Sequence, residues 1–555
     1  MTPGDKTVDT GSPTAESPPK LITGTDPTKD VAAGSPGGSV ETAPEGFDEV
    51  AYLAAFPDIA RSIKTGQFQS ALHHYRVHGQ REGRLTDVRY QRASIKGNTA
   101  NFPPASIDGL VGCKAGQCLI YGWIKDSDWP PIAQLTLRNN FGLWGTTQTV
   151  YRYRRKDVAD SLGLPDDKAL GFWAIVTVEK PETMFGPSEL VVSIGQERKT
   201  FNCQARSVSE ERFREIALEY VARAQHPGDA RVETFLQLDT GLGNLLISFS
   251  CEISRRIALG AQTLQIGTPP SSVDASVVVC LFTRPELLSI QCALFSKCRG
   301  LDRYEFIYVS NSPESADRLI KDATIANRVY GSPIRLVILP GNAGFGVANN
   351  AAVNAAQSPR ILFVNPDVFP MEPDWPSQHS QLVKNLPPEQ VALFGVPLFY
   401  DDGSLMHGGM YFEVDLGFSF RDNRATAREM LRVEHYGKGV PPATKAYLSS
   451  RPVPAVTGAF MSVDRSWFES LGSFSPEYIF GHYEDADLCL KSLNSGKPAW
   501  IHCLPFLHFE GKGSTPRLSL EGGMIVNRWH FTTVWSEFVK AGLLGKTPKL
   551  FSLRG

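Results

Sequence analysis

Between residues 275 and 367 the sequence alternates short apolar runs with stretches of helical periodicity. Each run is rich in Val, Ile, Leu and Phe and suits a strand that is buried on both faces. The runs are 275–283 (ASVVVCLFT), 304–311 (YEFIYVSN), 334–340 (IRLVILP) and 360–367 (RILFVNPD). Alternation of this kind implies right-handed crossovers, and it predicts a mostly parallel sheet with helices packed on it.

Polar residues follow these predicted strands. Ligands of a parallel sheet bind beyond the carboxyl ends of its strands, so these positions are the first candidates for a site. They include Thr283, Arg284, Asn311, Asn342, Asn365 and Asp367. The glycine-rich stretch 341–346 (GNAGFG) has the order GxxGxG and follows the third strand, so it does not match the dinucleotide fingerprint. The sequence also contains no phosphate loop of the GxxxxGKS or GxxxxGKT type.

Length and charge exclude several classes of function. A chain of 555 residues is too long for one hydrophobic core, and about three or four units are expected. With 56 basic and 58 acidic residues, the net charge of −2 gives no electrostatic case for nucleic-acid binding. The sequence predicts neither a membrane-spanning helix nor a secretory signal. Its nine scattered cysteines favour reduced thiols in a cytoplasmic protein.

Composition divides the chain into five segments. Residues 1–45 are poor in large apolar side chains and are predicted to be disordered. Helical spacing with glycine punctuation predicts a small helical module over 46–92. Short β-branched and aromatic runs predict a small β-sandwich-like domain over 105–205, followed by a helical linker over 206–268. The strand–helix alternation then defines an α/β domain over 272–545.

Three carboxylates crowd the stretch 481–490 (GHYEDADLCL), directly before an apolar run. Acidic residues suit the first turn of a helix, where free backbone N–H groups and the positive end of the helix dipole meet them. A crowded cluster also tends to raise the pKa of one member, which suits proton transfer. From these residues alone both interpretations stay open.

Two longer stretches resemble family 2 glycosyltransferases, of rhamnosyltransferase-like type. The first is NAGFGVANNAAVNAAQSPRILFVNPDVFP, and the second runs from VTGAFMSVDRSWFESLG through GHYEDADLCLKSL to FLHFEGKGS. The similarity covers about 274–540, and its motifs agree in order and spacing. It implies the Rossmann-like glycosyltransferase A (GT-A) fold of nucleotide-diphospho-sugar transferases, a nucleotide-sugar donor and a divalent metal, Mn²⁺ or Mg²⁺.

The resemblance also implies a metal site. Asn365 and Asp367 are two residues apart at a strand end, so their side chains can point to the same side. They occupy the aspartate pair of the family motif, and because the first is an amide here, Asp367 is the expected ligand and Asn365 an indirect contributor to donor binding. His508 falls where the family places a histidine that completes the metal shell, and imidazole can join carboxylate at Mn²⁺.

The same comparison assigns the acid cluster. The match places the catalytic base on Asp485, with Glu484 beside it as the less favoured alternative. Asp487 fits a structural role at the start of the helix.

Donor contacts are expected from Thr283, Arg284, Asn311, Asn342 and Gly344. Ser310 stands where the family often has an acid that reaches the nucleotide. Gly458 and Ala459 match a small-residue turn that lies against the sugar and the acceptor.

Two hypotheses for function follow. The first is an inverting, metal-dependent glycosyltransferase that moves a sugar to a glycan or lipid-linked acceptor during polysaccharide biosynthesis for the bacterial cell envelope. The alternative is a non-catalytic glycan-binding or scaffold protein with a degenerate transferase domain, favoured by the missing acids at Ser310 and Asn365. The basic, apolar stretch 539–555 leaves two interpretations open, peripheral association with the inner face of the plasma membrane or a solvated tail.

Overall fold

The computed structural model describes most of the chain. The described residues are 49, 53, 57–64, 68–75, 95–96, 102–125, 132–139, 142–165, 168–179, 181, 184–224, 230–421, 424–441, 444–511 and 515–543. The disorder predicted for 1–45 lies outside them. The chain divides into two compact units, Met1–Gln80 with Arg84–Val88, and Arg81–Gly83 with Arg89–Gly555. The first contains the short helices α2 (Pro57–Lys64) and α3 (Ala71–His74), which pack through Ile59 and Ala71.

The second unit begins with two five-stranded sheets that share one core. One has the order β1-β9-β8-β4-β5 and the other β10-β2-β3-β7-β6. Ile120 and Phe172 from one sheet pack with Leu135 and Phe201 from the other. The elements are β1 (Ile95–Lys96), β2 (Ala105–Gly112), β3 (Gln117–Ile124), β4 (Gln134–Asn139), β5 (Gly142–Thr147), β6 (Tyr151–Tyr153), α4 (Lys156–Leu162), β7 (Gly171–Thr177), β8 (Ser188–Ile194), β9 (Glu197–Cys203) and β10 (Arg206–Ser207).

Helices follow this β-rich region. They are α5 (Glu210–Arg223), α6 (Ala230–Gln237), the π-helical turn η3 (Leu238–Leu242) and α7 (Gly243–Leu259). Ser209 caps α5 by accepting a hydrogen bond from the Arg212 N–H. The Tyr220 ring of α5 packs against Tyr121 and Trp173 of the preceding sheet, with ring centroids 5.1 and 5.8 Å apart. Helix α5 therefore packs on the sheet that precedes it.

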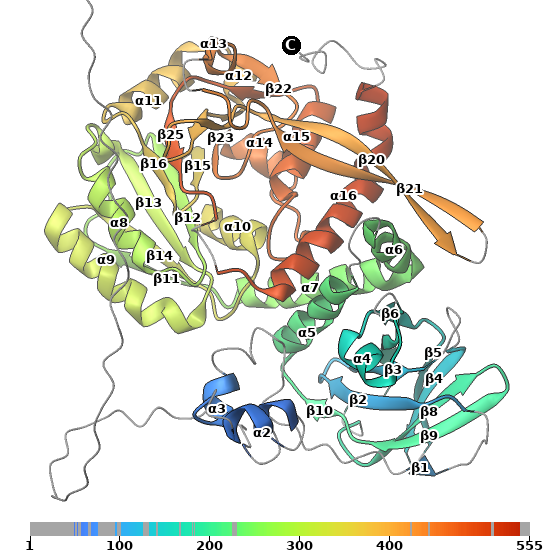
Figure 1. Ribbon diagram of the computed structural model, residues 1–555. Coiled ribbons are helices and arrows are strands. Elements are labelled where there is room, and N and C mark those ends of the chain that lie inside the picture. The colour runs from blue at the N-terminus through green and yellow to red at the C-terminus, as the bar shows by residue number, and fades with distance from the viewer. Residues whose placement is uncertain are drawn as a thin grey trace, which may run out of the picture. The chain divides into compact units, whose positions relative to one another are not determined.

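A mixed nine-stranded sheet forms the centre of the following α/β region (Figure 1). The four predicted strands lie side by side and parallel, in the order β14-β13-β12-β15. They are β12 (Ala275–Leu281), β13 (Tyr304–Ser310), β14 (Ile334–Ile338) and β15 (Arg360–Val364). Every residue of β12 and β13 is buried, which explains their continuous apolar runs.

Antiparallel pairings extend this sheet on both sides. β11 (Gln262–Ile266) pairs with β14, so the sheet begins within the range expected for the helical linker. On the other side lie β23 (Phe460–Asp464), β17 (Leu393–Gly395), β24 (Ala499–Ile501) and β22 (Arg451–Val453). The result is a mixed α/β sheet that contains the four parallel strands predicted from sequence and one further parallel pair, β17 with β24, that was not predicted.

Side chains alternate between two cores along β12. Val277 and Val279 pack with α8 (Glu286–Phe295) and α9 (Ala316–Tyr330), whereas Val278 and Cys280 face α7 and α10 (Phe345–Ala355). Two 3₁₀ turns, η4 (Leu301–Arg303) and η5 (Pro313–Ser315), lie on either side of β13. The helices α11 (Trp375–Asn385), α12 (Pro388–Val391), α13 (Lys445–Leu448) and α14 (Arg465–Ser470) occupy later connections.

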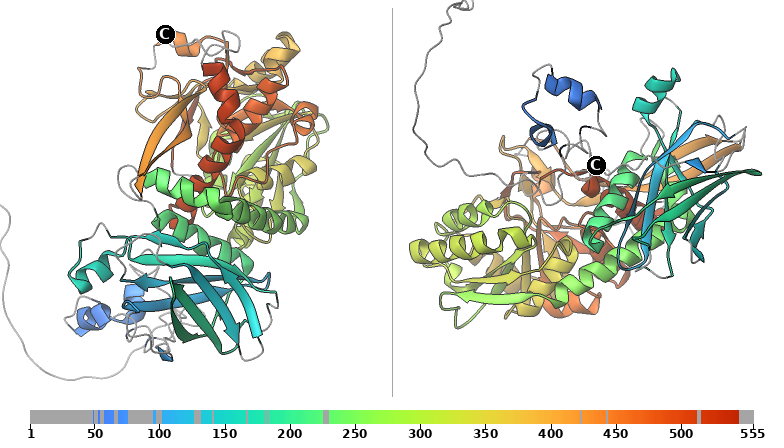
Figure 2. Two further views of the ribbon diagram at one scale, coloured as in Figure 1. Left: turned by 90° about the vertical axis from the view of Figure 1, so that its right-hand side faces the viewer. Right: turned by 90° about the horizontal axis from the view of Figure 1, so that it is seen from below.

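Two further sheets complete the region. A four-stranded sheet has the order β16-β25-β18-β19, and its strands are β16 (Val368–Pro370), β25 (Phe506–His508), β18 (Leu398–Phe399) and β19 (Leu405–His407). A long hairpin pairs β20 (Met410–Arg421) with β21 (Arg424–His435), and it was not anticipated from the sequence. It lies against the C-terminal helix α16 (Leu518–Leu543), where the Thr532 hydroxyl accepts the Leu431 N–H (Figure 1, Figure 2).

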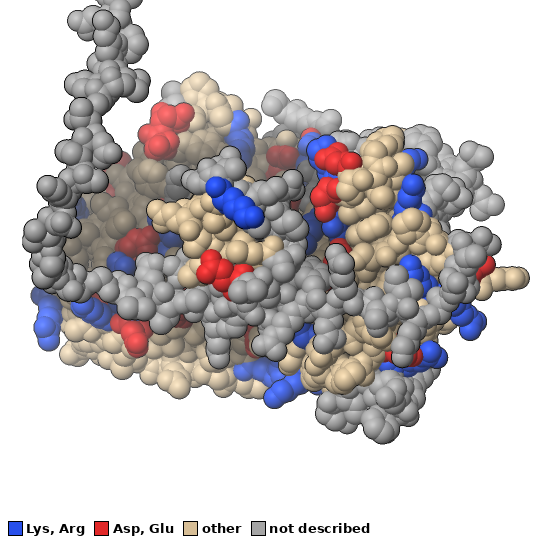
Figure 3. Space-filling model, turned by 60° about the horizontal axis from the view of Figure 1, so that its bottom comes forward, with Lys and Arg blue, Asp and Glu red and all other residues tan. Residues whose placement is uncertain are grey.

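The distribution of charged side chains is relevant to the predictions made from the net charge and from the basic stretch 539–555. Basic and acidic side chains are intermixed on the face drawn in Figure 3. Lys540 of α16 makes ion pairs with Glu429 (2.9 Å) and Glu537 (2.7 Å), so this member of the basic tail is held within the fold. The other tail lysines and Arg554 lie outside the described residues. Among the described helices, none has the length and apolarity needed to cross a bilayer.

Candidate functional site

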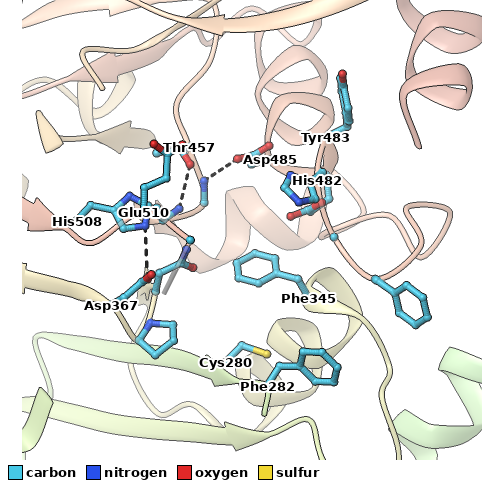
Figure 4. A pocket seen from close by; sticks show the side chains of 18 of the residues that line it. Cys280, Phe282, Phe345, Asp367, Thr457, His482, Tyr483, Asp485, His508 and Glu510 are labelled. Carbon is cyan, nitrogen blue, oxygen red and sulfur yellow. Dashed lines mark hydrogen bonds and ion pairs between the residues drawn. The ribbon is translucent and has the colours of Figure 1, made fainter. Parts of the chain in front are cut away.

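A pocket of about 610 Å³ lies at the carboxyl ends of the four parallel strands. This volume is in the range of sites for small organic ligands. Figure 4 shows its walls. The strand ends and following loops contribute Cys280, Phe282, Asn311, Asn342, Phe345, Asn365, Pro366 and Asp367, and later segments contribute Thr457, Gly458, Ala459, Phe480, Gly481, His482, Tyr483, Glu484, Asp485, His508, Glu510, Gly511 and Leu520. Most of the residues selected from the sequence are therefore neighbours in space.

One wall carries a carboxylate–imidazole pair. The antiparallel pairing of β16 with β25 sets Val368 opposite His508, and it brings the His508 Nε2 to 3.4 Å from the Asp367 Oδ1. Both side chains are buried. The Asp367 Oδ1 accepts no hydrogen bond in the described structure, and the His508 Nδ1 also lacks a hydrogen-bond partner there.

This pair fits a divalent cation that is shared with a ligand. A buried carboxylate oxygen without a donor is an unsatisfied acceptor, and a cation would satisfy it. Across the described residues no group of three or more His, Cys, Asp or Glu side chains forms a complete metal site. Mg²⁺-type sites commonly use one or two protein ligands and take the rest from water and phosphate. Asp367 and His508 are the residues that would hold such an ion.

Asn365 lies beside this pair at the end of β15. Its backbone N–H donates to the Ala459 carbonyl (2.8 Å), and its own carbonyl accepts from the Gln291 Nε2 (3.1 Å). These bonds fix the backbone between β15 and the 457–459 turn. The Asn365 side chain is thereby placed on the pocket wall, next to Asp367.

The opposite wall carries Asp485, in the first turn of α15 (Glu484–Asn494). The Gly458 N–H donates to the Asp485 Oδ2 at 2.9 Å, and the Ala486 N–H donates to the Asp485 Oδ1 at 2.8 Å. Figure 4 shows Asp485 and Asp367 on different sides of the same pocket. The turn expected to lie against the sugar therefore orients the expected base.

Glu484 has a different environment from its neighbour. Its side chain is buried, and its Oε2 accepts no hydrogen bond in the described structure. Burial raises the pKa of Glu484 well above 4.5, and the nearby negative charge of Asp485 raises it further. Burial and the neighbouring charge therefore favour the protonated form of Glu484 relative to an exposed carboxyl group.

Asp487 is buried away from the pocket and has structural partners. The Trp535 Nε1–H donates to the Asp487 Oδ1 at 2.9 Å, and the Lys491 ammonium lies 2.6 Å from the Asp487 Oδ2. The structural interpretation of Asp487 is thus consistent with its contacts, which tie the start of α15 to α16.

Two asparagines connect the loops after β13 and β14. The Asn311 Nδ2 donates to the Asn342 Oδ1 (3.1 Å), and the Ala343 N–H donates to the Asn311 Oδ1 (2.9 Å). The Gly344 N–H also donates to the Asn342 Oδ1. Gly344 has φ = +83°, and a Cβ there would lie 3.1 Å from the Phe480 Cα, so the position requires glycine.

Thr283 and Arg284 lie beside the pocket, outside its described lining. The Thr283 N–H donates to the Ser312 Oγ at 3.0 Å, and Arg284 forms an ion pair with Glu286. Ser310, which replaces an expected acid, is buried and donates to the Ser312 carbonyl. The loop after β12 and β13 is thus held by hydroxyl contacts, and Phe282 is its residue in the pocket.

Several pocket residues escaped the sequence analysis. Glu510 lies two residues after His508, a spacing that places both on one side of an extended chain and could have indicated it. Burial alone would raise the pKa of Glu510, but the hydrogen bond from Tyr400 and the charge of Lys438 lower it. Glu510 is therefore a second anionic group near His508.

The hairpin also contributes to the pocket. Met410 of β20 and Val433 and His435 of β21 line it, together with Met406 of β19. The apolar residues at every second position from Met410 to Phe420 indicate a strand, but nothing local indicates that its base reaches the site. His482 lines the pocket as well.

The fold and the pocket together define an α/β protein with a ligand site at the carboxyl edge of its parallel strands. No family model matches the chain. A curated relative, the uncharacterized protein y4gI of Sinorhizobium fredii (strain NBRC 101917 / NGR234), is 27% identical over 242 residues, which cover 41% of this chain and 24% of that protein. The chain thus spans about a quarter of the length of this relative.

Two solved structures of glycosyltransferases are similar to the chain. One is GalNAc-T7 with UDP, GalNAc and Mn²⁺, at 12% identity and a TM-score of 0.33, covering 50% of this chain and 52% of that chain. The other is the mannosyltransferase PcManGT from Pyrobaculum calidifontis with GDP-Man and Mn²⁺, at 14% identity and a TM-score of 0.30, covering 60% and 90%. At these scores the functional assignment depends on the residues of the pocket.

Proposed function

We propose that this protein is an inverting, metal-dependent glycosyltransferase of family 2 that uses a nucleotide-sugar donor. One observation carries the proposal: Asp367 with His508, and Asp485, line different sides of one pocket of small-ligand size. Sugar transfer needs a charge-neutralising group at the leaving diphosphate and a base at the acceptor hydroxyl. The two walls supply candidates for both tasks.

The chain's own residues divide these tasks. A divalent cation held by Asp367 and His508 would neutralise charge on the departing diphosphate. Asn311 and Asn342 shape the donor side through their mutual hydrogen bond. Asp485 would accept the proton of the acceptor hydroxyl, while the Gly458 N–H fixes the direction of its carboxylate. Glu484 is buried and its pKa is raised, and it is the less favoured alternative for the base.

A donor screen tests this proposal. Binding of the correct nucleotide sugar stabilises the folded protein by mass action, by about 2.7 kcal/mol at a ligand concentration 100 times Kd. We expect one nucleotide family to raise Tm with Mn²⁺ present and to have a smaller effect with EDTA. The stabilising donors are then tested for sugar transfer or slow hydrolysis. A panel without any stabilising donor would contradict the proposal.

A glycan-binding or scaffold protein with an inactive transferase domain remains the second candidate. The specific observation in its favour is Ser310, which is buried, bonded to the Ser312 carbonyl, and supplies no carboxylate to the donor side. This alternative predicts Mn²⁺-dependent donor binding with no turnover at any acceptor. Turnover that is lost in Asp485→Asn would exclude it.

The proposed setting is the cytoplasm, with a glycan or lipid-linked acceptor for surface polysaccharide at the inner face of the plasma membrane. A vesicle co-sedimentation assay tests the membrane part. Because Val539 is buried and Lys540 is paired with Glu429, the truncation should follow Leu543 and leave α16 intact. We expect the full chain to bind anionic vesicles more strongly than the truncated chain. Equal binding of the two chains would contradict the proposed membrane association.

A further inference from the structure

The segment that precedes the acid pair has an unusual backbone. Phe480, His482 and Tyr483 have φ values of +62°, +77° and +76°. Residues other than glycine rarely adopt this left-handed backbone region, because it brings the β-carbon too close to the following carbonyl oxygen. All three residues line the pocket, and Glu484 and Asp485 follow them directly. Such strain persists only when surrounding contacts impose it.

A single buried amide supplies most of these contacts. Asn527 of α16 is fully buried, and its Oδ1 accepts the Ile479 N–H at 2.7 Å. Its Nδ2 donates to the carbonyls of Ile479 (3.0 Å), Gly481 (2.7 Å) and His482 (3.1 Å). A carboxamide offers one acceptor oxygen and two donor hydrogens, and here both ends are bound to the same segment. The Ile479 N–H and the carbonyls of Ile479, Gly481 and His482 thereby gain partners outside the regular helix and strand pairing.

The segment 479–483 also contacts the donor side of the pocket. The Phe345 N–H donates to the Phe480 carbonyl at 2.5 Å. The Arg214 guanidinium lies 4.6 Å from the centre of the Phe480 ring and donates to the Asn342 carbonyl at 2.9 Å. The segment is therefore held between α16 on one side and the 342–345 loop on the other.

We propose that Asn527 is a positioning residue, whose amide holds segment 479–483 in its strained conformation and so presents Asp485 and His482 to the pocket. Asn527 does not line the pocket. Its effect on transfer rests on the proposed function, whereas its effect on the segment does not. Because small displacements of a reacting group are costly, release of the segment should lower kcat by about 100-fold.

Two variants separate positioning from general stability. Asn527→Asp is nearly isosteric and keeps an acceptor for the Ile479 N–H, but it places an oxygen against the three carbonyls. Asn527→Ala removes every side-chain hydrogen bond between residue 527 and the segment. The matched control is Asn327→Asp in α9. This change removes the hydrogen bond that the Asn327 side-chain amide donates to the Ser332 carbonyl, at a position distant in sequence from segment 479–483. Asn327 does not line the pocket.

The main readout is hydrogen exchange in the peptide that spans residues 477–486. We expect about tenfold faster exchange there in both Asn527 variants, with unchanged exchange in the strands of the nine-stranded sheet. The Asn327→Asp control should leave this peptide unchanged. Faster exchange throughout the sheet, or unchanged exchange at 477–486, would overturn the proposal.

The second readout compares catalysis with binding. In Asn527→Asp we expect kcat to fall about 100-fold while the donor Kd, measured with Mn²⁺, changes less than about threefold. An equal loss of binding and kcat would assign Asn527 to the donor site and overturn a positioning role. If the wild-type protein turns over no donor, the transferase proposal fails, and the exchange experiment still decides whether Asn527 holds the segment.

Discussion

Three carboxylates within four residues occupy three different environments. Glu484 is buried with a raised pKa, Asp485 faces the pocket and accepts two backbone N–H groups, and Asp487 is tied to Trp535 and Lys491. Crowding of like charge is eased here because burial favours the protonated form of Glu484 and because Asp487 is paired with Lys491. The cluster is therefore part structural and part functional, and single substitutions can separate its members.

Asp485→Asn should abolish most sugar transfer without unfolding the protein. The amide oxygen can still accept the Gly458 N–H, but it cannot take a proton from the acceptor, so we expect a loss of about 100- to 10,000-fold in kcat. The matched control is Asp487→Asn, which weakens the ion pair with Lys491 and should cost about 1 kcal/mol of unfolding free energy with transfer retained. Transfer assays and urea unfolding of both variants check this. Full activity in Asp485→Asn would reject the assignment of the base.

Glu484 should make stability depend on pH in a defined direction. Because its folded pKa lies well above the value of 4.5, the folded state holds more protons than the unfolded state as pH rises above about 4.5. Glu484 therefore lowers the unfolding free energy as the pH rises, by up to about 1.4 kcal/mol per pH unit. The decrease stops when the pH passes the folded pKa of Glu484. Glu484→Gln removes this titration, so the unfolding free energy of the variant relative to the wild type should grow as the pH rises from about 5 toward the folded pKa of Glu484. A constant difference in urea unfolding across that range would contradict the buried, neutral state.

At the scale of elements, the pairing of β16 with β25 creates the proposed cation site. Asp367 immediately precedes β16 and His508 ends β25, so only the antiparallel register brings them to 3.4 Å. Asp367→Asn removes the charge but keeps the shape. We expect it to abolish the Mn²⁺-dependent rise in Tm with a nucleoside diphosphate. Asp374→Asn, which alters an exposed ion pair with Arg299, should leave that rise unchanged, and a rise retained in Asp367→Asn would argue against the site.

Two adjacent glycines of α16 test how closely α5 approaches it. A Cβ at Gly522 would lie 1.9 Å from the Leu218 carbonyl oxygen, whereas one at Gly523 would meet its nearest atom at 3.4 Å. Alanine gains helix propensity of up to about 1 kcal/mol at either position. Gly522→Ala should nevertheless lower the unfolding free energy by about 1–3 kcal/mol, because backbone must move, and Gly523→Ala should be neutral or stabilising. Similar unfolding curves for the two variants would contradict the close helix contact.

At the scale of the whole molecule, the sequence predicts the parallel part of the central sheet well. The strands β12 to β15 are continuous apolar runs, and the polar residues after them converge because parallel strands end at one edge. The pocket positions of Asn311, Asn342, Asn365 and Asp367 follow from that geometry, whereas Asp485, in the first turn of α15, was selected by the family resemblance.

Other parts of the site depend on contacts that have no local signal. The hairpin of β20 and β21 reaches the pocket through Met410, Val433 and His435, and its strand β21 is hydrogen-bonded to α16 through Leu431. Asn527 contacts segment 479–483 across more than forty positions of sequence. Side chains that act through a distant backbone carry no motif, so only the folded chain reveals them.

The central claim is that one pocket places a cation beside Asp367 and His508 and a sugar-bearing diphosphate between that cation and Asp485. Crystals grown with Mn²⁺ and a nucleotide donor, measured for manganese anomalous scattering, test it most directly. The account predicts an anomalous peak in contact with the Asp367 carboxylate and the His508 imidazole, bridged to the diphosphate, with the sugar facing Asp485. A donor bound elsewhere, or a manganese peak away from Asp367, would contradict it.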